Sequence, residues 1–231
     1  MSNQEPQKVG DLIPQSLENL SHLERIPSPE PEKKLDYLSL AKAELKKICL
    51  GNRYLDLDET KIRNLVTIKA WLKLFLSGDK RGAVFTGDRG SGKTSILHWI
   101  ALKLFEYSRW QYLKNDPDPQ PQRTISISIM RTSNLTRAFV QQDKETIEIA
   151  QTTPIVMLDD FARHYQHDFP TSMLEDLIEF RYANELPTFI AMDISLQALG
   201  QQEKWEAMVD RFRDSKWMYG ALSLGVGSQR Q

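Results

Sequence analysis

The residues with the clearest chemical potential form one octapeptide, GDRGSGKT, at positions 87–94. Its glycines allow backbone N–H groups to point at phosphate oxygens, its lysine can contact the β- and γ-phosphates, and its threonine hydroxyl can bind Mg²⁺. The alternative is a glycine-rich surface turn with a solvated lysine. The spacing favours a site for ATP and Mg²⁺, and we predict that it is built from Gly87, Asp88, Arg89, Gly90, Ser91, Gly92, Lys93, Thr94 and Ser95.

A second motif, IVMLDD at residues 155–160, is an apolar run that ends in two carboxylates. In phosphate-loop enzymes, a strand beside the loop strand supplies an Asp that holds Mg²⁺ together with the loop hydroxyl. We therefore predict that Asp159 and Thr94 are the magnesium ligands. Asp160 is then placed to orient or deprotonate the water that attacks the γ-phosphate. The alternative is an ordinary turn at the end of a strand.

The elements around these motifs alternate between strands and helices. Short apolar or alternating runs predict strands, and apolar residues at helical spacing predict the helices between them. Because a Ser172–Glu175 capping box fits a helix start, we place the beginning of one helix there. Alternation of this kind predicts an α/β fold, a five-stranded parallel sheet in a three-layer sandwich. The predicted strands are 83–85, 124–130, 154–158, 188–194 and 218–224, and the helices 35–50, 62–77, 94–105, 134–151, 172–184 and 204–216.

Composition limits the classes of function. A length of 231 residues suits one α/β domain with an extension, and a net charge of -1 gives no global attraction to nucleic acid. A single cysteine, Cys49, excludes a disulfide framework and a cysteine-based zinc site. No apolar run is long enough to span a membrane. We expect a soluble, cytoplasmic protein without a membrane partner.

The N-terminal residues differ from the rest of the chain. Residues 1–47 are predicted to be a partly disordered partner-binding segment and linker, with a proline-rich run at 26–32, and residues 48–231 to be the catalytic domain. Ile13, Leu17 and Leu20 have the spacing of a short amphipathic helix. Such a helix docks on a partner protein or folds back on its own domain, and the sequence leaves both open.

From about residue 48 to 230, the chain resembles the DnaC/IstB-like branch of the AAA+ ATPases, which contains helicase loaders of the DnaC and DnaI type. The ordered set of motifs is more specific than the two phosphate-site motifs alone. Two departures stand out: Asp193 lies where the family's sensor usually has Asn, and the chain ends at Gln231 without room for a C-terminal lid domain. The matching segments are Gly51–Tyr54, GDRGSGKT, VMLDDF, Arg181–Tyr182, Leu186–Ser195, Val209–Phe212 and Ser228–Arg230.

The resemblance implies an AAA+ fold without a lid and an ATP-dependent helicase loader. Arg53 and Tyr54 are expected near the adenine. Arg211 is expected to act as an arginine finger in the ATP site of a neighbouring subunit of a homo-oligomer, which makes it catalytic. Arg213 is the rival finger, and the alternative for Arg211 is a surface ion pair with Asp210 or Asp214.

The resemblance also implies partners: single-stranded DNA, and a replicative helicase held by the N-terminal segment. Arg131, Ser133 and Arg137 fall where related proteins face single-stranded DNA, although an ordinary amphipathic helix with solvated arginines fits equally well. Asp193 is expected to act on catalysis, because an acid near the γ-phosphate repels it, so we expect Mg²⁺-dependent hydrolysis that is slow and stimulated by DNA or oligomerisation.

Two alternatives to the helicase loader remain. One is an IstB-like transposition ATPase that partners a transposase. The other is a weakly hydrolysing, ATP-dependent switch or inhibitor of a replication protein, which Asp193 favours. A small-molecule kinase would leave the Arg211 segment unexplained.

Overall fold

The computed structural model describes residues 31–115, 125–162 and 168–225. The described residues from Tyr37 onward form one compact unit. The predicted amphipathic segment around Leu17 and the Ser228–Arg230 motif lie outside the described residues. The compact unit begins at Tyr37 because Tyr37, Ala41 and Leu45 are buried. The function predicted for residues 1–47 stays a prediction.

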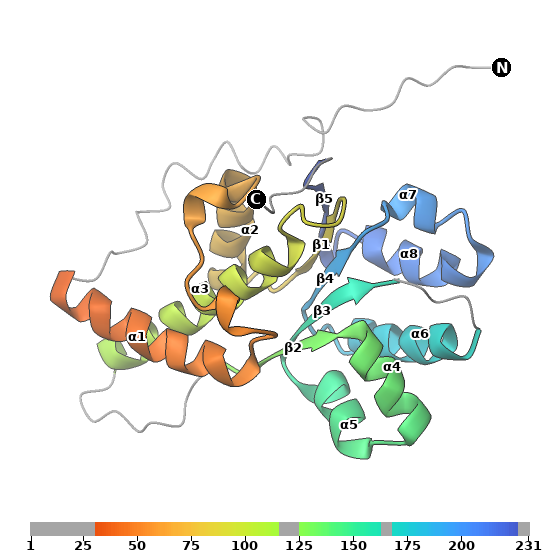
Figure 1. The fold of residues 1–231 in the computed structure, drawn as a ribbon, viewed down its shortest axis with the longest axis horizontal. Helices are drawn as coiled ribbons and strands as arrows, with labels where there is room; N and C mark the ends of the chain where they lie inside the picture. Colours follow the sequence, from red (N-terminus) through yellow and green to blue (C-terminus); the bar gives the residue numbers. More distant parts are fainter. Residues whose placement is uncertain (1–30, 116–124, 163–167, 226–231) are drawn as a thin grey trace. The chain divides into compact units, whose positions relative to one another are not determined.

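Strands and helices alternate along the domain, as the sequence predicted (Figure 1). The strands are β1 (Gly82–Thr86), β2 (Ile127–Arg131), β3 (Ile155–Phe161), β4 (Thr188–Met192) and β5 (Met218–Ser223). The α-helices are α1 (Pro31–Ile48), α2 (Leu65–Leu76), α3 (Lys93–Asn115), α4 (Thr132–Gln141), α5 (Lys144–Thr152), α6 (Asp168–Ala183), α7 (Leu196–Leu199) and α8 (Glu206–Arg213). Short 3-10 turns are η3 (Asn52–Tyr54), η4 (Glu59–Lys61) and η5 (Glu203–Trp205).

The five strands form one sheet in the order β2-β3-β4-β1-β5, and every neighbouring pair is parallel. The prediction of a five-stranded parallel sheet is therefore confirmed. The strand that carries Asp159, β3, was expected beside the loop strand β1, and this was wrong, because β4 lies between them. Parallel strands present their carboxyl ends at one edge of the sheet, which is where ligands bind in open α/β folds. The phosphate-loop motif after β1, the two carboxylates at the end of β3 and Asp193 after β4 consequently meet at this edge.

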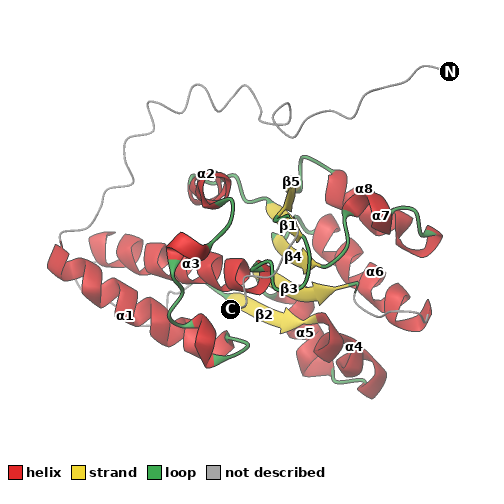
Figure 2. Ribbon diagram, turned by 45° about the horizontal axis from the view of Figure 1, so that its top comes forward, coloured by secondary structure: helices red, strands yellow, loops and turns green. Residues whose placement is uncertain are grey.

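Helices cover both faces of the sheet (Figures 1 and 2), and the central strands β1, β3 and β4 are accordingly buried along nearly their whole length. Phe85, Met157 and Phe189 point to one face, where they pack with residues of α1, α2 and α3. Val84 and Ile190 point to the other, where they pack with residues of α4, α5, α6 and α8. The two apolar clusters give the predicted three-layer arrangement. No helix in the described ranges combines the length and apolar character needed to cross a membrane.

Three helix predictions were wrong in detail. The helix predicted at 94–105 is α3, which continues to Asn115. The region predicted as one helix at 134–151 is two helices, because Gln142 adopts a left-handed conformation with φ of 54° and Asp143 caps α5 by accepting from the Thr146 N–H at 3.2 Å. The helix predicted to begin at Ser172 begins at Asp168. Ser172 therefore lies inside α6 and is not its N-cap.

Candidate nucleotide-binding site

The phosphate-loop motif connects β1 directly to the first turn of α3. Two of its glycines, Gly90 and Gly92, have φ values of 81° and 98°, which a side chain would disfavour. The Ser91 N–H donates to the Asp88 carbonyl at 3.1 Å and closes the turn. The loop thus delivers backbone N–H groups and the positive end of the α3 dipole to one point, which is a general anion site.

Lys93, the first residue of α3, folds back over its own loop. Its Nζ donates to the carbonyls of Gly87 at 2.6 Å and Asp88 at 2.9 Å, and it lies 2.8 Å from Oδ1 of Asp193. Only 6% of the side chain is exposed. In this conformation the ammonium group is held by two carbonyls and one carboxylate, with a longer contact to the Ser91 hydroxyl at 3.5 Å.

Thr94 and Asp159 meet across the sheet edge. The Thr94 hydroxyl lies 3.0 Å from each carboxylate oxygen of Asp159. Thr132, at the start of α4, donates to the Asp159 carbonyl at 2.9 Å and fixes the backbone there. Burial raises the pKa of Asp159 to about 6, and the neighbouring Asp160 carboxylate adds to the increase. A hydroxyl and a carboxylate in contact are hard oxygen donors of the kind that Mg²⁺ takes in nucleotide sites.

Asp160 lies in a bulge of β3. Between Leu158 and Phe161, β3 has one residue more than its partner β4, in which Ile190 and Met192 are the matching residues. Asp160 adopts a left-handed φ of 55°, which Asp tolerates better than most residues. Such bulges redirect side chains next to functional sites. This one lets Asp159 contact Thr94 while the adjacent Asp160 lines the pocket.

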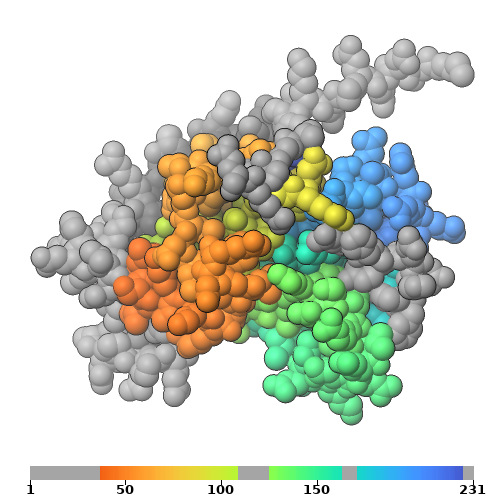
Figure 3. All heavy atoms as spheres, viewed as in Figure 1, coloured from red at the N-terminus to blue at the C-terminus, as the bar shows by residue number. Residues whose placement is uncertain are grey.

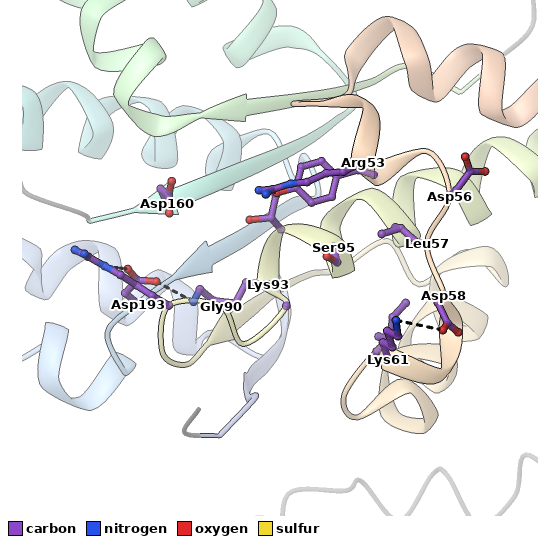
Figure 4. Close-up of a pocket in the computed structure, with 15 residues that line it drawn as sticks. Arg53, Asp56, Leu57, Asp58, Lys61, Gly90, Lys93, Ser95, Asp160 and Asp193 are labelled. Atoms are coloured by element: carbon purple, nitrogen blue, oxygen red, sulfur yellow. Dashed lines mark hydrogen bonds and ion pairs between the residues drawn. The ribbon is translucent and has the colours of Figure 1, made fainter. Parts of the chain in front are cut away.

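The loop, the β3 bulge and Asp193 border a pocket of about 490 Å³. Figure 4 shows Asp160 and Asp193 at one end of it, Leu57, Asp58 and Lys61 at the other, and Gly90 and Lys93 between them. Because the phosphate loop lies between the ends, a nucleotide has room for its base toward η4 and its phosphates toward Asp160. The lining residues are Arg53, Tyr54, Asp56, Leu57, Asp58, Lys61, Ile62, Arg89, Gly90, Gly92, Lys93, Thr94, Ser95, Asp160 and Asp193.

Arg53 and Tyr54, predicted near the adenine, do line this pocket. The Tyr54 ring is stacked on His98 with 4.2 Å between ring centroids, and only 6% of Tyr54 is exposed. The Arg53 guanidinium lies 4.7 Å from the centroid of the same ring and donates to its hydroxyl. Arg53 is exposed. With Tyr54 covered, Arg53 is the better placed of the two to meet a base or ribose.

His98, which the sequence did not single out, ties η3 to the phosphate-loop helix. The Leu50 N–H donates to Nε2 at 3.0 Å, and Nδ1 lies 2.7 Å from the Thr94 carbonyl. Since Nε2 accepts, Nδ1 carries the proton and donates to Thr94. Burial lowers the pKa of His98, with a smaller contribution from the Arg53 charge. Its position four residues after Thr94 on an apolar helix face was the available sequence signal.

Arg211, the predicted finger, lies in α8 and forms an ion pair with Glu179 of α6. It also donates to the Ala207 carbonyl at 2.7 Å, and its guanidinium carbon lies 5.7 Å from the Tyr182 ring centroid. The alternative pairing of Arg211 with Asp210 or Asp214 is wrong, since Glu179 is the partner. Arg213 is 54% exposed and lies 3.9 Å from Asp210. Neither arginine lines the pocket of its own chain.

The three residues predicted to contact DNA are all exposed. Arg131 ends β2 and precedes α4, and Ser133 and Arg137 lie one helical turn apart on α4. Figure 3 shows α4 and α5 in green on the same face of the domain as residues of the α1–η4 region in orange. The positive charge of Arg131 lowers the pKa of Asp159 slightly against the larger effect of burial. This places Arg131 close enough to the β3 end to act on it electrostatically.

No family model matches the sequence, and no curated protein matches it as a relative. The fold does match solved structures. The DnaI structure has 21% identity and a TM-score of 0.53, covering 81% of this chain and 93% of that one. A protein assigned as a primosome component of Streptococcus pyogenes serotype M3 has 21% identity and a TM-score of 0.57, covering 83% and 98%. The DnaC helicase loader has 19% identity and a TM-score of 0.51, covering 71% and 88%.

The agreement extends over most of both chains in each case, so it concerns the whole domain rather than the phosphate loop alone. At these identities the similarity establishes architecture. The domain therefore has the AAA+ fold of the DnaI and DnaC proteins, as the sequence predicted.

Proposed function

We propose that this chain is an ATP-dependent replication factor of the helicase-loader type. The observation that carries the proposal is the contact between Thr94 and Asp159 beside the Lys93 loop, within a domain folded like the DnaC helicase loader. A hydroxyl, a carboxylate and a lysine in these positions match the requirements of a magnesium–triphosphate site. The resemblance to a primosome component supports the same branch of function. We expect the protein to act in the cytoplasm.

Thr94 and Asp159 would hold Mg²⁺ in this proposal. Among the described residues, no group of three or more acidic, His or Cys side chains could hold a metal ion. A cation here would thus depend on nucleotide oxygens as well as on Thr94 and Asp159, as is usual for Mg²⁺. When bound, the ion neutralises phosphate charge. Asp159 would bind the ion in its ionised form.

The remaining chemistry belongs to side chains of this fold. Lys93 would bind the β- and γ-phosphates once it exchanges its present partners, two carbonyls and the Asp193 carboxylate, for phosphate oxygens. Asp160, turned into the pocket by the bulge, would accept a hydrogen bond from the attacking water and orient it. Loss of this interaction costs about a hundredfold or more in typical enzymes.

The proposed finger requires a second copy of the chain. Arg211 and Arg213 lie on α8, outside their own pocket, so either could act only on a neighbouring site. Arg211 would have to leave Glu179, whereas Arg213 has the more exposed side chain. To identify the finger, the rate of ATP hydrolysis and the nucleotide affinity are measured for Arg211→Ala and for Arg213→Ala. The finger variant keeps its affinity and loses about a thousandfold of the turnover. Two variants that both hydrolyse ATP normally would rule out the shared site.

Single-stranded DNA is the proposed nucleic-acid partner. Arg131 and Arg137 would contact backbone phosphates, with Ser133 as a neutral donor. The test compares the wild type with the double variant Arg131→Ala/Arg137→Ala. The affinity of each for a labelled single-stranded oligonucleotide is measured at two salt concentrations. The double variant should bind more weakly and show a shallower salt dependence.

The decisive experiment for the function is steady-state ATP hydrolysis with and without single-stranded DNA, using Lys93→Ala as the inactive control. We expect slow turnover that DNA increases. A pulldown of a replicative helicase by the full chain, and by residues 37–231 alone, tests the role of the N-terminal segment. Equal capture by both forms would remove that segment from the proposal.

One observation favours a second candidate, a nucleotide-dependent switch that hydrolyses ATP weakly. Asp193 lies in contact with Lys93, where an acid opposes a triphosphate. ATP binding without turnover, with or without DNA, would favour this switch over the loader.

A further inference from the structure

The contacts of Lys93 leave no donor for a phosphate in the present conformation. An ammonium group has three N–H donors. Those of Lys93 are directed to Gly87 O, Asp88 O and Oδ1 of Asp193, at 2.6, 2.9 and 2.8 Å, and the Ser91 hydroxyl is a longer contact at 3.5 Å. A phosphate oxygen can bind Lys93 only by replacing one of these partners.

Asp193 is the only charged partner among those three, and it contacts two cations of the loop. Its Oδ1 lies 2.8 Å from Lys93 Nζ, and its Oδ2 lies 3.4 Å from Arg89 Nε. The Asp193 side chain is 26% exposed, so these contacts are only partly screened by water. The carboxylate thus supplies negative charge to a phosphate-loop lysine and to a second loop cation, as a bound anion would.

The location of Asp193 in the pocket indicates which phosphate of a bound nucleotide its carboxylate would lie near. Asp193 follows β4 and lies with Asp160 at the end of the pocket opposite Leu57 and Asp58 (Figure 4). If the base lies toward Asp58, the last phosphate of a bound nucleotide lies toward Asp193. A diphosphate can take the places of the Gly87 and Asp88 carbonyls on Lys93 while the ion pair with Asp193 persists. A triphosphate brings further negative charge against the carboxylate.

We propose that Asp193 acts as an internal substitute for the terminal phosphate, so that the site favours a nucleoside diphosphate over a triphosphate. This inference rests on the proposed nucleotide-binding function and names the residue that sets the preferred nucleotide state. Like charges placed side by side oppose each other by amounts that change affinity about tenfold or more. The triphosphate must displace the carboxylate from Lys93, and the diphosphate does not.

The test is calorimetric titration of the full chain with Mg²⁺–ADP and with a non-hydrolysable Mg²⁺–ATP analogue. The quantity compared is the ratio of the two dissociation constants, triphosphate over diphosphate. Asp193→Asn keeps the shape of the side chain and removes its charge, and Asp193→Ser serves as a second variant if Asn lowers the melting temperature. Asp176→Asn, at an exposed position of α6, is the control for the change in net charge.

We expect Asp193→Asn to lower this ratio about tenfold, with the affinity for ADP almost unchanged, and Asp176→Asn to leave it unaltered. A ratio that falls by less than fivefold in both Asp193 variants overturns the inference. In that case, binding of both nucleotides by the wild type leaves the proposed function standing. A wild-type chain that binds neither nucleotide overturns the proposed function, and this inference with it.

Discussion

Two buried cations of the domain, Arg181 in α6 and Lys93 in the phosphate-binding loop, are neutralised in different ways. Arg181 is fully buried, and its partners are backbone carbonyls and the Thr188 hydroxyl, at 2.8–3.5 Å. Burial lowers its pKa to about 10, so it stays charged. Lys93 has two backbone carbonyls and a carboxylate, and it borders an open pocket.

This difference in partners makes Arg181 a structural cation, whereas Lys93 is available to a ligand. Several partners of Arg181 are carbonyls at the C-terminal end of α5, where the helix dipole favours a positive charge. They belong to the backbone and cannot be exchanged without moving α5 or β4. The Asp193 partner of Lys93 is a side chain, which can rotate away when a phosphate arrives. Burial and charge alone would not distinguish the two residues, but the nature of their partners does.

The largest expected effect is that of Arg181→Met on stability. Methionine fills much of the volume but leaves several buried carbonyls without a donor, so we expect a loss of about 4 kcal/mol in the free energy of unfolding. Urea denaturation measures it, with the exposed Arg137→Met as a control that should change stability by less than about 0.5 kcal/mol. Similar losses in the two variants would show that the network around Arg181 is not what holds α5.

Lys93→Ala should produce the opposite pattern. Its carbonyl and carboxylate partners face a pocket that water can enter, so we expect a stability change within about 1 kcal/mol. Nucleotide affinity should fall about a hundredfold, because the phosphates lose their direct cation. Calorimetric titration and urea denaturation of the same preparation give both values. If this variant unfolds as readily as Arg181→Met, the comparison between the two cations is wrong.

The sequence predicted the part of this comparison that depends on local pattern. The phosphate-loop spacing located Lys93, and the apolar runs predicted the strands. Because β1 and β3 run parallel in one sheet, on either side of β4, Thr94 and Asp159 lie at the same edge. The break between α4 and α5 was missed because apolar residues at helical spacing lie on both sides of it. The polar run at 141–146, which contains the Asp143 cap of α5, was the available signal.

Long-range pairing could not be obtained from the sequence. Asp193 was expected to repel phosphate, but nothing in its neighbours along the chain indicates that it contacts Lys93, a hundred residues earlier. In the same way, the partner of Arg211 was sought among Asp210 and Asp214, whereas the packing of α8 on α6 supplies Glu179. Contacts of this kind depend on how helices and strands pack, which residue spacing does not encode.

His98 combines features of the two cations. Like Arg181 it is buried and hydrogen-bonded to the backbone, through Leu50 N–H and Thr94 O, and like Lys93 it lies beside the nucleotide pocket. His98→Phe keeps the ring against Tyr54 and loses the hydrogen bonds with Leu50 N–H and Thr94 O. We expect a loss of about 1–2 kcal/mol at pH 7.5. Urea denaturation measures it, and the same measurement at pH 5.5 tests the protonation state.

The pH dependence has a definite sign. Folding lowers the pKa of His98 from its value of about 6.5 in the unfolded chain. The contribution of His98 to the free energy of unfolding is therefore complete above pH 6.5 and is lost as the pH falls below 6.5 toward the pKa of the folded chain. The phenylalanine variant has no such loss, and groups such as Asp159 titrate in both forms. The stability gap should therefore narrow at pH 5.5. A gap that is equal at both pH values would mean that His98 is not held neutral.

Arg53 is expected to give the smallest effect, and it completes the series with a cation whose partner is an aromatic ring. Arg53 is exposed, lies over the Tyr54 ring and can turn toward a base or ribose. Arg53→Ala should therefore weaken nucleotide binding about threefold to fivefold, which is what a cation–π contact contributes at an exposed site. Turnover at saturating ATP should remain unchanged, because Arg53 is expected to meet the base or ribose and not the phosphates. Tyr54→Phe is the matched control: it keeps the ring stacked on His98 and removes only the hydroxyl that Arg53 contacts. If Tyr54→Phe weakens binding more than Arg53→Ala does, the tyrosine rather than the arginine meets the nucleotide.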